Sequence, residues 1–267
     1  MFFLFSADYI DICRTAVQKI YPDGSSTIMV ADTPCFREPG WELRGRPATV
    51  GGKPTPDSEK RERALRRARA RVLDIARANV DLAYFVTLTL DERKIDRYDI
   101  NEQMRRMRGW LSNRVQREGL KYVLVPELHK DGAVHYHGLI NDVLQREDSG
   151  TMSFGGGKPF RVKRRDRSKM LEAGARVVYN LPEWDYGFTT AIKLYGERSK
   201  AINYVCKYIG KGGGKIGGRY YLSGGALLSP EKRFFDADFE LFKDDNHVFT
   251  IERLGARVVK FEAEGEL

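Results

Sequence analysis

Between residues 57 and 211 the spacing of the apolar residues alternates between helical and strand periods, and this alternation limits the fold more than any other feature of the sequence. Residues 84–90 (YFVTLTL) are β-branched and aromatic, with Val86 and Leu88 on one face, which is typical of a strand. Three further strands are expected at 122–127, 133–141 and 188–194. Three helices, indicated by apolar residues three and four positions apart, are expected at 57–79, 99–118 and 197–211.

The order of these elements predicts the α+β class, with one antiparallel sheet and helices on one face. The strands at 122–127 and 133–141 should form a β-hairpin, because the short loop between them ends in Asp131-Gly132. The last helix is followed by a Gly-rich stretch to Gly225, which we expect to act as a flexible lid or hinge. Residues 57–225 are therefore predicted to form the main domain.

Three other segments have a different character. Residues 1–56 are punctuated by Gly and Pro every few positions, so we expect an irregular N-terminal extension with room only for short strands or turns. Residues 145–182 form a long, basic insertion, and Phe154 and Phe160 in it could stack on the bases of single-stranded DNA. Residues 226–267 form an acidic C-terminal segment.

The distribution of charge indicates a polyanionic partner. The chain has 46 Lys and Arg against 37 Asp and Glu, a net charge of +9. The surplus is concentrated at 60–77, 158–176 and 193–219, which is the pattern of a nucleic-acid-binding protein. Solvated helix faces would give the same composition, so charge alone does not decide between these interpretations. Residues 231–267 hold six bases against ten acids and should stay off the polyanion.

Several classes of protein are excluded by the sequence. No run of about 20 apolar residues is present, so no membrane partner is expected, and residues 1–8 lack the pattern of a secretory signal. The cysteines Cys13, Cys35 and Cys206 are widely spaced and form no CxxC motif, which argues against a disulfide scaffold or zinc knuckle. A cytoplasmic location is expected.

A carboxylate and two imidazoles form the first candidate site. His135 and His137 are two residues apart in a predicted strand and therefore point to the same face, where they could bind a divalent metal ion. Whether Glu127 joins them depends on the hairpin loop. A three-residue loop with a left-handed Gly132 pairs Glu127 with His135, whereas a two-residue loop turns it to the other face.

Two tyrosines form the second candidate site. At 100° per residue Ile202, Val205 and Ile209 make a compact apolar stripe, while Tyr204 and Tyr208 lie on the opposite side. The cations that share this side are Lys200, Lys207 and Lys211. A phenol with a pKa near 10 needs nearby positive charge to act as a nucleophile, and attack on an anionic phosphodiester needs a cation as well. The tyrosines, the lysines and a metal ion would together suffice to cut a nucleic-acid strand.

With these motifs the sequence resembles the HUH endonucleases that initiate rolling-circle replication. The matching features are the strand at 85–89, the His135-Tyr136-His137 pair with Glu127 eight positions before it, and the helix with overlapping YxxK units, Tyr204 to Lys211. The doubled tyrosine looks most like the two-tyrosine initiators of small single-stranded DNA phages. Together the motifs span residues 84–211, under half of the chain.

The resemblance implies a nuclease fold similar to that of the RNA-recognition motif and a Mg or Mn ion held by Glu127, His135 and His137. Tyr204 or Tyr208 would attack the phosphate of single-stranded origin DNA, with Tyr204 slightly favoured as the first nucleophile. The products would be a 5′-phosphotyrosine and a free 3′-hydroxyl. Lys207 and Lys211 would position or neutralise the phosphate. No ATPase motif is present, so a host helicase and a host DNA polymerase are the expected partners, in a bacterial cytoplasm.

Two alternatives remain open at the level of sequence. A transposase or conjugative relaxase would use the same chemistry. A non-catalytic DNA-binding regulator would instead read DNA through the basic helix at 60–77, and its binding would survive loss of both tyrosines and of the metal.

Overall fold

The computed structural model describes residues 13–37, 57–96, 98–129, 132–155, 157–194, 196, 198–211, 214–244, 246–251 and 255–264. The chain divides into two compact units. One is formed by residues 56–229, and the other combines residues 1–55 with residues 230–267. No helix in the described ranges is both long and apolar enough to cross a membrane.

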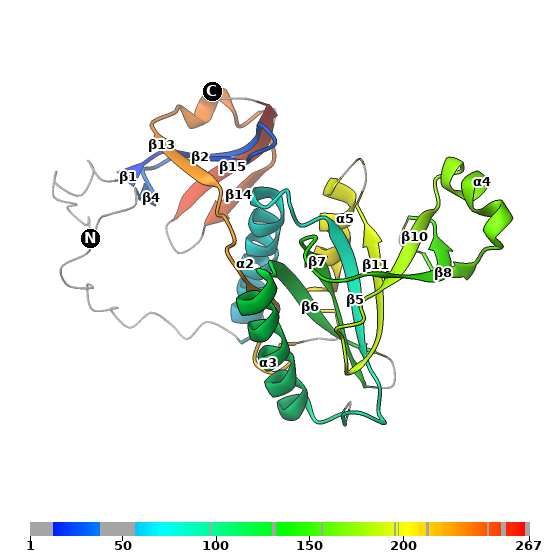
Figure 1. Ribbon diagram of the computed structural model, residues 1–267. Coiled ribbons are helices and arrows are strands. Elements are labelled where there is room, and N and C mark those ends of the chain that lie inside the picture. Colours follow the sequence, from blue (N-terminus) through cyan, green and yellow to red (C-terminus); the bar gives the residue numbers. More distant parts are fainter. Residues whose placement is uncertain are drawn as a thin grey trace. The chain divides into compact units, whose positions relative to one another are not determined.

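The unit of residues 56–229 is built on an eight-stranded antiparallel sheet with the strand order β12-β6-β7-β5-β11-β10-β8-β9 (Figure 1). Its central strands are β6 (Tyr122–Leu128), β7 (Val134–Ile140), β5 (Tyr84–Leu90) and β11 (Gly187–Lys193). The helices are α2 (Asp57–Ala78), α3 (Ile100–Glu118), α4 (Arg167–Glu172) and α5 (Arg198–Tyr208). The predicted α+β class is confirmed, and each strand and helix expected between residues 57 and 211 is present within a few residues of its expected bounds.

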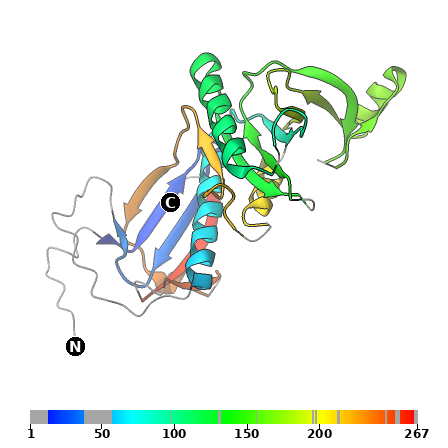
Figure 2. The ribbon, with the colours of Figure 1, turned by 90° about the horizontal axis from the view of Figure 1, so that it is seen from below.

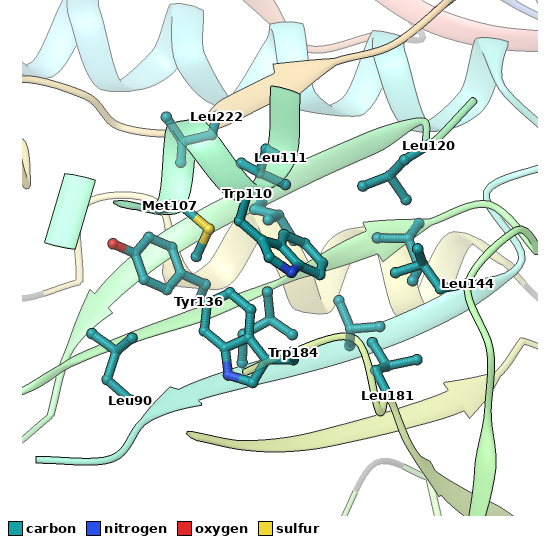
Figure 3. Close-up of a cluster of buried hydrophobic side chains, with 14 of the residues drawn as sticks. Leu90, Met107, Trp110, Leu111, Leu120, Tyr136, Leu144, Leu181, Trp184 and Leu222 are labelled. Atoms are coloured by element: carbon teal, nitrogen blue, oxygen red, sulfur yellow. The ribbon is translucent and has the colours of Figure 1, made fainter. Parts of the chain in front are cut away.

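One face of the sheet is covered by α3. Trp110 and Leu111 of this helix pack with Met107 against Tyr136 of β7 and Leu90 of β5 (Figure 3). Trp184 lies edge-on to Trp110, with the ring centroids 5.1 Å apart, and closes the side of this core. The helix starts where the Asp99 side chain accepts hydrogen bonds from two backbone N–H groups and ends at the left-handed Gly119.

The other face of the same strands is covered by α2 and α5. Phe85 and Val125 point to this side and pack against Val72 of α2 and Val205 of α5. The helices therefore lie on both faces of the sheet, which corrects the expectation of one covered face. The reason is that alternate residues of β5 and β6 are apolar on both sides of the strand, so each side needs a cover.

The basic insertion folds as an arm that extends the sheet (Figure 1). It contains β8 (Glu147–Ser153), β9 (Phe160–Arg161), a short 3-10 helix (Arg164–Asp166), α4 and β10 (Arg176–Asn180). The rings of Phe154 and Phe160 stack on each other with centroids 5.5 Å apart. In the described residues the insertion is thus a folded part of the sheet rather than an isolated loop.

The Gly-rich stretch after α5 contains an edge strand. Residues Leu222–Gly224 form β12, which pairs with β6. Gly225 has a φ of +87°, and a Cβ there would lie 2.2 Å from the backbone oxygen of Leu120. At this position glycine therefore allows a close approach of two backbones, where the sequence suggested a flexible lid.

The second unit joins residues from the two ends of the described chain in one five-stranded sheet of order β13-β2-β3-β15-β14 (Figure 2). Its strands are β2 (Ala16–Ile20), β3 (Ser25–Ala31), β13 (Glu231–Phe235), β14 (Val248–Ile251) and β15 (Ala256–Glu264). A short 3-10 helix (Phe239–Leu241) and the pair β1 (Cys13–Arg14) and β4 (Phe36–Arg37) complete it. The N-terminal and C-terminal segments, expected as separate pieces, thus share a core around Ile28 and Val259. The rest of the expected N-terminal extension lies outside the described residues.

Candidate active site

The register of the hairpin brings the carboxylate to the histidines. Glu127 of β6 pairs directly with His135 of β7. His129 N–H donates to the Ala133 carbonyl, and Gly132 has a φ of +87°. This is the pairing that a three-residue connection requires, so Glu127, His135 and His137 share one face of the sheet.

Threonines of the neighbouring strand β5 hold both imidazole rings. Thr87 pairs with His137, and its hydroxyl lies 3.0 Å from the Nδ1 atom of that ring. Thr89 pairs with His135, and its hydroxyl lies 3.4 Å from Nδ1. Because Nδ1 is engaged in each ring, Nε2 is the nitrogen left to meet a ligand.

Helix α5 brings the tyrosines to the histidines. Ile202 and Val205 anchor the helix in the core, and the tyrosines project from its other side, as the helical spacing predicts. The Tyr208 ring stacks on His137 with centroids 4.2 Å apart, and the Tyr204 ring meets Phe85 edge-on at 5.5 Å. The structure therefore unites two motifs that lie about 70 residues apart in the sequence.

The two phenols are joined by a hydrogen bond. The Tyr208 hydroxyl donates to the Tyr204 hydroxyl, and the rings meet edge-on at 5.1 Å. Burial raises the pKa of Tyr208, and the hydrogen bond to Tyr204 and the charge of Glu127 raise it further. Tyr204 is more open, with 38% of its surface exposed. Tyr208 is thus held as a neutral phenol that donates to the oxygen of Tyr204.

The two candidate lysines are placed differently. Lys211 Nζ lies 2.6 Å from Oε1 of Glu127 and 5.2 Å from the centre of the Tyr208 ring, and the contact with Glu127 raises the Lys211 pKa. Lys207 is exposed, and within the described part of the chain no hydrogen bond or ion pair ties it to the site. The structure therefore brings Lys211 to the cluster but leaves Lys207 at its margin.

The arrangement of ligand atoms is compatible with a divalent metal ion at two of the three expected positions. His137 Nε2 lies 3.0 Å from Oε2 of Glu127. Two atoms that bind one Mg ion at about 2.1 Å and at right angles to each other are separated by about 3 Å. Burial lowers the pKa of His137 to about 4, against the opposing effect of Glu127, so the imidazole is neutral at pH 7 and has a lone pair to offer.

The third ligand is less well placed. The His135 and His137 rings are 6.4 Å apart, and among the described residues no group of three or more His, Cys, Asp or Glu side chains is arranged to hold a metal ion. The donor set suits Mg or Mn in its chemistry. Binding through all three side chains would require the His135 side chain to turn toward Glu127.

The sequence interpretation missed two neighbours of the site. His129 was read as a surface residue of the hairpin loop, but its ring stacks on His135 with centroids 4.9 Å apart. Phe188 pairs with Thr89 across β5 and β11, so it lies on the same face as His135, and 62% of its surface is exposed. The spacing of two residues between Glu127 and His129 was the available signal, because alternate residues of a strand share a face.

Comparison with known protein families gives one match. Residues 83–213, just under half of the chain, are similar to the family of replication-associated proteins named after ORF2. This region includes Glu127, both histidines of the pair and both tyrosines. No curated protein and no solved structure matches the chain. The match supports a role in DNA replication.

Proposed function

We propose that this protein initiates DNA replication by cutting single-stranded origin DNA. A tyrosine phenol loses its proton, and its oxygen attacks the phosphorus of a phosphodiester. The bond between phosphorus and the 3′ oxygen breaks, and that oxygen takes up a proton. The products are a 5′-phosphotyrosine and a free 3′-hydroxyl from which a host polymerase could extend, while a host helicase opens the duplex.

The observation that carries this proposal is the stack of Tyr208 on His137 at 4.2 Å. It places the two tyrosine hydroxyls beside the strand face that offers a carboxylate and imidazoles. The similarity of residues 83–213 to replication-associated proteins supports the same conclusion independently of the geometry.

The hydrogen bond between the phenols favours Tyr204 as the first nucleophile. Since Tyr208 donates to the Tyr204 oxygen, its hydroxyl would stabilise a phenolate at Tyr204. Tyr204 is also the more exposed of the two and can be reached by a DNA strand. Tyr208 is then available for a second attack that rejoins the strand.

Glu127, His135 and His137 are the residues that would hold Mg or Mn. When bound, such an ion polarises a phosphate oxygen and offsets its negative charge. Lys211, now paired with Glu127, can turn its ammonium group to the phosphate when DNA enters. The threonines on β5 keep the imidazole rings oriented.

A covalent-adduct assay tests the proposal. Labelled single-stranded DNA that carries a candidate origin is mixed with the protein and Mn, denatured, and separated by size. We expect a shifted band for the wild type, a weaker band for Tyr204→Phe than for Tyr208→Phe, and no band for the double variant. DNA binding without an adduct on the true origin, in any variant, would identify a DNA-binding regulator instead. An adduct that forms on transposon ends or on a transfer origin but not on a replication origin would assign the same chemistry to a transposase or relaxase.

A further inference from the structure

A cavity of about 510 Å³ lies beside Tyr204, at the N-terminal half of α5. It is bounded by Phe85 of β5, by the end of β11, by the start of α5 and by Arg176 at the first position of β10. The arm formed by the insertion therefore closes a pocket that the central strands alone would leave open (Figure 1).

The lining of this pocket combines cations with an apolar wall. Arg176, Lys193 and Lys200 supply positive charge, and none of the described residues around the cavity is acidic. Ile192 and the edge-on pair of Phe85 and Tyr204 supply the apolar wall. An anionic group joined to a flat apolar group fits such a lining, and a volume of this size accommodates a small organic ligand.

We propose that the pocket binds one nucleotide of the single-stranded substrate, next to the phosphodiester that is cut. The cations hold the phosphate of this nucleotide, while its base lies against Ile192 and the ring of Phe85. Tyr204 belongs both to the pocket and to the tyrosine pair, so a nucleotide held here places the adjoining phosphate at the phenol oxygen. This inference rests on the proposed function and adds a substrate subsite to it.

The test measures binding apart from cleavage. A fluorescein-labelled single-stranded 12-mer of random sequence is titrated with the full chain in EDTA, and the anisotropy is followed at several salt concentrations. Ala201→Trp fills the pocket without changing its charge, and we expect it to weaken binding at least about fivefold. Arg176→Ala and Lys193→Ala should each weaken binding and reduce the salt dependence, by about 0.7 in the logarithmic slope for each phosphate that the variant no longer neutralises.

Two matched variants control for charge and bulk. Arg117→Ala removes an exposed arginine from α3, on the opposite face of the sheet, and Ser112→Trp adds an indole there. Both should bind within twofold of the wild type. Thermal unfolding identifies any variant that fails to fold. If Ala201→Trp does not fold, Lys193→Glu replaces it, since Lys193 is exposed and its charge reversal should weaken binding more than Lys193→Ala does.

Unchanged binding by Ala201→Trp, or an equal loss in Arg117→Ala and Arg176→Ala, would overturn the subsite. The adduct assay separates this result from failure of the proposed function. Adduct formation together with binding that ignores the filled pocket overturns the subsite alone. Pocket-dependent binding with no adduct on the true origin overturns the chemistry and retains a nucleotide-binding pocket.

Discussion

The two faces of the central sheet are made by the same strands but do different work. On the α3 side, Tyr136 is fully buried and its hydroxyl donates to the sulfur of Met104. On the α5 side, its chain neighbours His135 and His137 contact threonines, a carboxylate and a tyrosine. One strand therefore supplies a packing residue and two candidate ligands in three consecutive positions.

This difference shows how the candidate site is kept rigid. The α3 face is a continuous apolar core in which Leu88 and Leu90 pack with the large rings of Trp110 and Trp184. The polar face inherits the position of its side chains from that core, since the strand backbone is common to both. A change on one face should therefore affect stability, and a change on the other should affect chemistry.

The largest effect is expected from His137→Ala. Loss of this imidazole would remove a metal ligand and the surface on which Tyr208 stacks. We expect the rate of adduct formation to fall about 10³-fold or more, whereas non-specific DNA binding and the unfolding midpoint in urea change little. Full cleavage by this variant would contradict the metal role of His137.

Tyr136→Ala should show the opposite behaviour. Removal of a fully buried aromatic side chain leaves a cavity in the α3 core, and we expect a loss of about 3–5 kcal/mol in the free energy of unfolding. Urea unfolding followed by circular dichroism measures it. His135→Ala, one position away, is the control and should cost about 1 kcal/mol or less. Equal losses in the two variants would remove the distinction between the faces.

Thr87→Val would sharpen the comparison within the polar face. The valine keeps the shape of the side chain but removes the hydroxyl that lies 3.0 Å from Nδ1 of His137. Residues that orient a ligating histidine contribute about 10–100-fold to metal affinity or activity. We expect a loss in this range, measured as Mn affinity by calorimetry. Thr190→Val, at the position paired with Thr87 on β11, should bind Mn as the wild type does.

Phe188→Ala tests whether the open part of the polar face meets DNA. The exposed ring can stack on a base, a contact worth about 1–3 kcal/mol, and we expect the lower end because one side of the ring stays in water. Anisotropy with the single-stranded 12-mer measures the change. Leu228→Ala removes another exposed apolar side chain and should leave binding unaltered. Equal affinities of Phe188→Ala and the wild type would show that this ring does not contact the strand.

The smallest effect is expected from Lys207→Ala. Lys207 is exposed and stands apart from Glu127, whereas Lys211 contacts it. An exposed charge at this distance contributes little, so we expect the rate of adduct formation to fall about twofold. Lys211→Ala should cause the clearly larger loss. The reverse order would mean that the phosphate lies nearer to the exposed end of the helix face.

The sequence determined which segments are helices and strands, because that information is local. The alternation in residues 84–90 and the stripe of Ile202, Val205 and Ile209 specify an element and its buried side without reference to the rest of the chain. The same periodicity placed His135 and His137 on one face and the two tyrosines away from the apolar stripe.

The tertiary structure decided everything that depends on distant partners. The contact between Tyr208 and His137 and the placement of α3 and α5 on opposite faces arise from packing between segments far apart in the chain. The same is true of the pairing of β3 with β15, which joins residues more than 220 positions apart. A local period states that a face must be covered, but the residues that cover it are chosen only when the whole chain packs.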